Sequence, residues 1–272
     1  MIRIAVLDLY DGQPNQGMRC IREIIAHWGE TMQQEVMFQI FDVRSRQEVP
    51  DLSFDFYISS GGPGSPIESE GSEWEAAYFS WLSQVEAWNA KPRHYNKKFV
   101  FFICHSFQLI CRYLKLAQVT KRRSTAFGVF PVHLTSKGSN DVIFNNLPDP
   151  FYVVDSRDWQ VIQPDLNALE AAGAEILCIE KERPHVPYER AIMGIRFNKY
   201  FVGTQFHPEA DATGMTLYLQ SSEKKEMVIQ NYGEEKWKSM IEGLNNPGKI
   251  MLTYSHILPN FLNQAAQMIS AA

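Results

Sequence analysis

The sequence predicts an α/β fold: an open, mostly parallel sheet with helices on both faces, followed by a helical C-terminal extension. Two observations support this prediction. Between residues 2 and 116, short apolar runs alternate with longer segments of helical apolar spacing, which is typical of parallel strands joined by crossover helices. The 272 residues are also 45% hydrophobic and 21% charged, a composition typical of a globular chain with a buried core.

Each element of the first half follows from a local pattern. An apolar run with β-branched residues predicts a buried strand over residues 2–9. Apolar positions at helical spacing predict a helix over 17–28, which Gly29 can end. By the same criteria, strands are predicted over 36–43, 54–59 and 99–103, and helices over 73–90 and 105–116.

The pattern changes after Ala126. Short apolar runs then predict strands in hairpins or at a mixed sheet edge, over 129–135, 152–154, 176–179, 191–197 and 201–206. Helices are predicted within 213–272, over 223–232, 235–244 and 250–269. We therefore expect a main domain over 1–211 and a helical extension over 212–272 packed on it, either as extra cover for the core or as a dimer or partner surface.

Composition and charge exclude several classes of function. The net charge of −5 argues against general nucleic-acid binding, which needs clustered basic surface. The four cysteines are scattered without a Cys-x-x-Cys pair, so we expect no disulfide framework, no metal site and a reducing, cytoplasmic compartment. No run approaches the roughly 20 apolar residues of a membrane helix, and no phosphate-loop, flavin or nicotinamide motif suggests a cofactor.

A cysteine occupies a position suited to nucleophilic chemistry. Cys104 directly follows the apolar run 99–103 and precedes a predicted helix, so it lies in a tight turn at the carboxyl end of a strand. Ligands bind at that edge of open α/β sheets, and a helix N-terminus favours the reactive thiolate. Taken alone, such a cysteine is more often a small buried hydrophobe.

Two further segments follow predicted strands. His207 can act as a general base after the strand 201–206, and Glu209 can orient its imidazole and stabilise the charged ring. Gly61 and Gly62 follow the strand 54–59. Backbone without a Cβ can approach a ligand closely, and its N–H groups can then serve as donors in an oxyanion hole. Separately, these segments also fit an ordinary surface histidine and an ordinary turn.

Together, the three segments resemble the class I glutamine amidotransferases, the triad-type glutaminase domains, and most closely stand-alone members similar to the amidotransferase part of GMP synthase. Residues 203–209 match the family's Gly-x-Gln-Phe-His-Pro-Glu motif, and residues 61–63 match its Gly-Gly-Pro loop. Gln108 stands four residues after Cys104, as in the family. The resemblance covers about residues 1–211 and implies a flavodoxin-like fold.

The resemblance also implies an activity. Cys104 would attack the carboxamide of glutamine to form a γ-glutamyl thioester, with His207 as the base that Glu209 orients. Gly61, Gly62, His105 and Gln108 would bind the substrate or its oxyanion. The family passes the released ammonia to an acceptor, which implies a separate synthetase or acceptor subunit here, and a homodimer is also open.

The sequence departs from the family at the turn around the cysteine. Phe102 and Ser106 stand where the family usually has glycines, and residues 156–158 (Ser-Arg-Asp) stand for its His-x-Asp. We expect the turn to be retained and the space around the thiol to be reshaped, unless neighbouring side chains compensate. Two alternatives stay open. The first is a cysteine hydrolase or peptidase, because the Cys104-His105 pair is similar to that of intracellular peptidases, and because γ-glutamyl hydrolases use a related fold. The second is a degenerate amidotransferase domain that serves as a binding or regulatory module.

Overall fold

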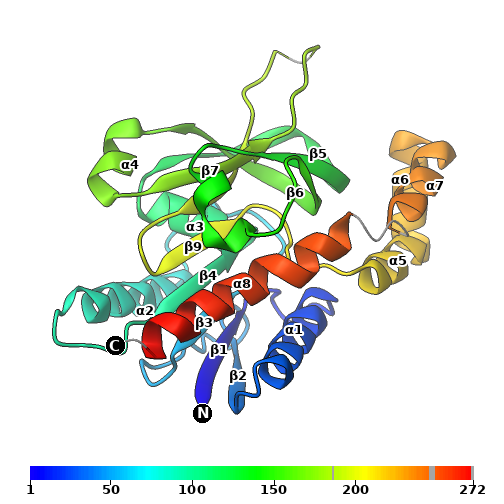
Figure 1. The fold of residues 1–272 in the computed structure, drawn as a ribbon. Helices are drawn as coiled ribbons and strands as arrows, with labels where there is room; N and C mark the ends of the chain where they lie inside the picture. Colours follow the sequence, from blue (N-terminus) through cyan, green and yellow to red (C-terminus); the bar gives the residue numbers. More distant parts are fainter. Residues whose placement is uncertain (186, 245–248, 271–272) are drawn as a thin grey trace.

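The structure is a computed structural model that describes residues 1–185, 187–244 and 249–270. Its centre is a nine-stranded sheet in the order β2-β1-β3-β4-β9-β8-β7-β5-β6 (Figure 1). The parallel part consists of β1 (Ile2–Asp8), β2 (Val36–Asp42), β3 (Phe56–Ser59), β4 (Phe99–Ile103) and β9 (Phe201–Thr204). The antiparallel part consists of β8 (Ile192–Arg196), β7 (Glu175–Glu180), β5 (Ala117–Leu134) and β6 (Phe151–Pro164).

Helices cover both faces of the central strands β1, β3, β4 and β9, whose apolar residues are mostly buried, while the edge strand β2 is partly exposed. In β4, Phe99 and Phe101 belong to the core under α1 (Gly17–Thr31) and α8 (Ile250–Ser270). Val100 and Phe102 belong to the opposite core, under α2 (Glu73–Ala90), α3 (His105–Tyr113) and α4 (Leu166–Ala172). The alternation of side chains along a strand therefore assigns each residue of β4 to one of two helical layers.

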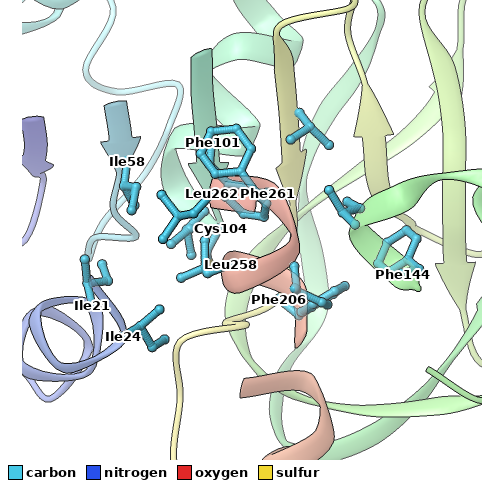
Figure 2. Close-up of a cluster of buried hydrophobic side chains, with 14 of the residues drawn as sticks. Ile21, Ile24, Ile58, Phe101, Cys104, Phe144, Phe206, Leu258, Phe261 and Leu262 are labelled. Carbon is cyan, nitrogen blue, oxygen red and sulfur yellow. The ribbon is translucent and has the colours of Figure 1, made fainter. Parts of the chain in front are cut away.

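The C-terminal helix α8 is part of the main core. Its side chains Leu258, Phe261 and Leu262 pack beside Phe101 and Cys104, as Figure 2 shows. The rings of Phe101 and Phe261 meet edge to face with centroids 5.3 Å apart. The preceding helices α5 (Ala212–Gln220), α6 (Ser222–Tyr232) and α7 (Glu234–Leu244) form a separate small cluster against β5 and β6, which also includes Ile250 at the start of α8.

The predicted fold class is confirmed, while the prediction for the second half gives two strands too short and misses one helix and two 3₁₀ turns. The predicted strands over 129–135 and 152–154 are the ends of much longer strands, because β5 and β6 pair antiparallel over most of their length. The helix α4 was not predicted; Asp165 caps it through a hydrogen bond from the Ala168 N–H, 3.0 Å long. The 3₁₀ turns η1 (Gly138–Asn140) and η2 (Val142–Phe144) were not predicted either.

The helices expected near the C-terminus are present over the described residues, and 245–248 and 271–272 of that segment lie outside them. None of the helices in the described ranges is long and apolar enough to cross a membrane.

Candidate active site

Cys104 lies at the junction of β4 and α3 with an unusual backbone. Its φ of +48° and ψ of −96° are rare for a residue with a side chain, and such conformations concentrate at functional sites. The Cys104 N–H donates to the Thr204 carbonyl at 2.8 Å, and its own carbonyl accepts from the Gln108 N–H at 3.0 Å. The turn is thereby tied to both β9 and α3.

His207 and Glu209 follow β9, next to β4 in the sheet. The ring Nδ1 of His207 and Oε1 of Glu209 are 2.8 Å apart, and the Glu209 side chain is buried. The His207 N–H donates to the Val154 carbonyl of β6 at 2.9 Å. Burial alone lowers the pKa of His207, but the Glu209 carboxylate and the Cys104 thiol, which both hydrogen-bond the ring, raise it well above the usual value.

The Gly61–Gly62 turn lies against this pair. A Cβ at Gly61 would come within 2.8 Å of His207 Cε1 and 3.5 Å of Cys104 Cβ. A Cβ at Gly62 would come within 2.2 Å of the Leu9 carbonyl oxygen. Only glycine fits at either position. These close approaches show that the Gly61–Gly62 turn, Cys104 and His207, which were predicted from three distant segments, meet at the carboxyl ends of β3, β4 and β9.

Gln108 reaches Cys104 through a second glutamine. Its Nε2 donates to Gln205 Oε1 at 3.2 Å, and Gln205 Nε2 lies 3.7 Å from the Cys104 sulfur. Both amides are buried. The sequence did not indicate Gln205 as a site residue, although it stands inside the 203–209 motif. It lies two residues before His207, the spacing at which side chains of an extended backbone share one face.

The side chain of His105 is buried next to the Trp74 ring, with centroids 6.5 Å apart. Burial and the nearby guanidinium groups of Arg44 and Arg112 lower its pKa to about 3, so the ring is neutral near pH 7. Its Nε2 has no hydrogen-bond partner in the described part of the chain. With a pKa of about 3, the His105 ring is too weak a base to take a thiol proton near pH 7, while its backbone starts α3 next to Cys104.

Residues that replace family positions have other contacts. Arg157 is buried, with Nε 2.9 Å from Asp155 Oδ1 and Nη2 3.4 Å from Glu180 Oε1, so it belongs to a buried ion network. The neighbouring Ser156 carbonyl lies 3.9 Å from the Cys104 sulfur.

Phe102 is accommodated on the face of the sheet away from the thiol's core. Its ring packs on Phe197 and Phe201, with centroids 5.8 and 5.9 Å away. It pairs with Gly203 across the sheet, where an added Cβ would meet Phe102 Cβ at 2.9 Å. The missing side chain of Gly203 therefore gives Phe102 its room, and the turn is retained.

Tyr10 is a neighbour of the site that the sequence did not indicate. A Cβ at Gly17 would meet the Tyr10 hydroxyl at 2.6 Å and Glu209 Oε1 at 3.1 Å, so both groups lie beside the first residue of α1. Burial raises the pKa of Tyr10 well above its usual value, and the charges of Glu209 and Cys104 add to the rise.

Comparison with known proteins identifies the family. The model of the family described as glutamine amidotransferase class-I matches residues 19–223. A comparison with curated proteins gave no significant match.

Solved structures share the fold at low identity. A glutamine amidotransferase from Thermotoga maritima has a TM-score of 0.68 and 16% identity, with 98% of each chain covered. One from Methylobacillus flagellatus has a TM-score of 0.62 and 12% identity, covering 97% of this chain and 94% of that one. The glutaminase domain of Trypanosoma brucei CTPS with bound acivicin has a TM-score of 0.59 and 14% identity, covering 98% and 94%. Because the family model matches more than half of its residues, this chain belongs to the class I glutamine amidotransferases.

Proposed function

We propose that the protein releases ammonia from the side-chain amide of glutamine through a γ-glutamyl thioester on Cys104. Membership of the class I glutamine amidotransferases supports amidotransferase-type activity. The observation that carries the finer proposal is the contact of Cys104 with a His207 ring whose Nδ1 is bonded to Glu209. This is the arrangement of a nucleophile, a base and an orienting group.

The residues suggest the following steps. The Cys104 thiolate attacks the amide carbon, and N–H groups of Gly62 and His105 hold the oxyanion that develops. The proton held by His207 passes to the amide nitrogen, the carbon–nitrogen bond breaks, and ammonia leaves a thioester. Water then attacks the thioester, His207 takes the proton of that water and returns it to the sulfur, and glutamate departs.

The fate of the ammonia is a second part of the proposal. We propose that it passes to a separate synthetase or acceptor subunit, as the family suggests. We also propose the division of the sequence into 1–211 and 212–272. That division does not separate two cores, because α8 packs into the main one.

The test is glutamate release from glutamine by the purified chain, with γ-glutamyl amides and peptides assayed beside it. Release from glutamine that is lost in Cys104→Ser supports the proposal. Hydrolysis of peptides with glutamine left intact favours a cysteine peptidase. No turnover of any substrate, together with an unreactive Cys104, favours a binding module.

His105 provides a test between the two enzyme classes. We expect His105→Gln to keep kcat/KM within about threefold of the wild type, because a ring with a pKa of about 3 is too weak a base near pH 7 and the residue then contributes only its backbone N–H. Steady-state glutaminase kinetics measure this, with His207→Gln as the matched control that should lose activity. Equal losses in the two variants would make His105 the base and favour the peptidase alternative.

Glu209 is expected to act through the charge of His207. Without the carboxylate, the pKa of His207 falls, so the imidazolium that stabilises the thiolate is present only at lower pH. We expect Glu209→Gln to lower kcat/KM by about 10²-fold, less than His207→Ala, and to slow alkylation of Cys104 near pH 6. The pH profile of iodoacetamide labelling measures the second effect. An unchanged profile would mean that Glu209 does not set the charge of His207.

A further inference from the structure

One hydroxyl group joins the ends of β3 and β4, two of the three strands that carry the site. Ser106 is fully buried in the first turn of α3. Its Oγ accepts the Ile103 N–H at 2.8 Å, and its O–H has two carbonyl acceptors in reach, that of Ser59 at 2.8 Å and that of Ile103 at 3.0 Å. Ile103 is the last residue of β4, and Ser59 is the last residue of β3. The Ser106 hydroxyl therefore bridges β3, β4 and α3 at one point.

Both bridged strands lead directly into the site. Cys104 follows Ile103, and Ser60 and the Gly61–Gly62 turn follow Ser59. Ser60 Oγ accepts the Leu9 N–H at 2.9 Å and donates to the Gly61 carbonyl at 2.8 Å, which holds the turn against β1. In the same way, the Ser106 hydroxyl holds the turn that carries Cys104.

We propose that Ser106 is a positioning residue that fixes the gap between Cys104 and the Gly62 N–H. The inference rests on the proposed function, in which the N–H groups of Gly62 and His105 hold the oxyanion. Oxyanion donors act over roughly 2.7–3.1 Å, so a small shift of the turn relative to the sulfur weakens them in the transition state. A glycine at position 106 has no hydroxyl and leaves this bridge unmade.

Loss of the Ser106 hydroxyl should weaken the binding of the transition state more than the binding of the substrate. We expect Ser106→Ala to lower kcat about 10-fold with KM within about twofold, because the lost contact is one that matters as charge develops on oxygen. The rate of inactivation by the chloroketone analogue of glutamine, whose carbonyl occupies the same position, should fall by a similar factor. Alkylation by iodoacetamide, which needs only the thiolate, should stay unchanged.

The matched control is Ser59→Ala. The Ser59 hydroxyl makes a buried hydrogen bond of similar length to the Tyr78 hydroxyl, 2.8 Å, while the bridge uses only the Ser59 carbonyl. We expect this variant to leave both labelling rates and kcat within about twofold of the wild type. If Ser106→Ala does not fold, Ser106→Gly, the residue usual in the family, removes the same hydroxyl and should show the same losses.

Two results would overturn the inference. One is a Ser106 variant whose kcat and chloroketone rate match those of Ser59→Ala. The other is an equal loss in the iodoacetamide rate, which would mean general damage to the turn. Failure of the proposed function has a separate signature: wild-type Cys104 resists the chloroketone, and Cys104→Ser keeps full turnover.

Discussion

Cys104→Ser removes glutamine turnover, with an expected loss in kcat of at least about 10³-fold. The hydroxyl of serine is a far weaker acid than a thiol, so the neighbouring imidazole no longer generates an anionic nucleophile. The substitution is nearly isosteric, and the turn is held by main-chain bonds of Cys104 to Thr204 and Gln108, so the fold should persist. His207→Ala should be equally damaging because it removes the group that carries the proton.

Glutamate release measures turnover, and limited alkylation with peptide mapping measures which thiol reacts. All four cysteines are buried, but their surroundings differ. Burial raises the pKa of Cys20 to about 12 and raises the pKa of Cys111 and Cys178 well above the usual value. Cys104 instead contacts the His207 ring. We therefore expect the first label on Cys104; a first label elsewhere, or full activity in Cys104→Ser, would contradict the assignment.

The convergence of the candidate residues was predictable because of strand order. The turns after β3, β4 and β9 are each read from an apolar run that ends in polar or glycine residues, and these strands are neighbours in the sheet. Parallel strands place their carboxyl ends at one edge of the sheet. The meeting of three distant segments can therefore be predicted without any knowledge of side-chain contacts.

Other features depend on contacts that local patterns do not contain. β5 was predicted too short because its first half carries Lys121, Arg122 and Arg123, which interrupt an apolar pattern although the backbone pairs with β6. The sequence also gives no sign that Tyr10 approaches Glu209, since only the fold brings β1 and α1 to that end of β9. Similarly, the helical pattern of α8 predicts an apolar face but not the core that it enters.

The Gly61–Gly62 turn leads to the second large effect: we expect Gly62→Ala to lower kcat by about 10²- to 10³-fold. A Cβ at this position would lie 2.2 Å from the Leu9 carbonyl oxygen and 2.9 Å from its carbon, both backbone atoms. Leu9 cannot give way easily, because its side chain is fully buried and its N–H is held by Ser60 Oγ. The turn must therefore move instead.

Movement of the turn carries the Gly62 N–H away from the sulfur but leaves the nucleophile and base in place. The expected result is a large loss in kcat and in chloroketone inactivation, with iodoacetamide labelling of Cys104 largely kept. Gly29→Ala is the control, because its added Cβ lies in α1, far along the chain from the site, and would meet a Val36 methyl group at 3.0 Å and the Gln34 carbonyl oxygen only at 3.3 Å. Thermal unfolding of both variants separates loss of the fold from loss of the donor. If a folded Gly62→Ala protein kept wild-type turnover, the Gly62 N–H would not be an oxyanion donor. The His105 N–H would then be the remaining donor of the proposed pair.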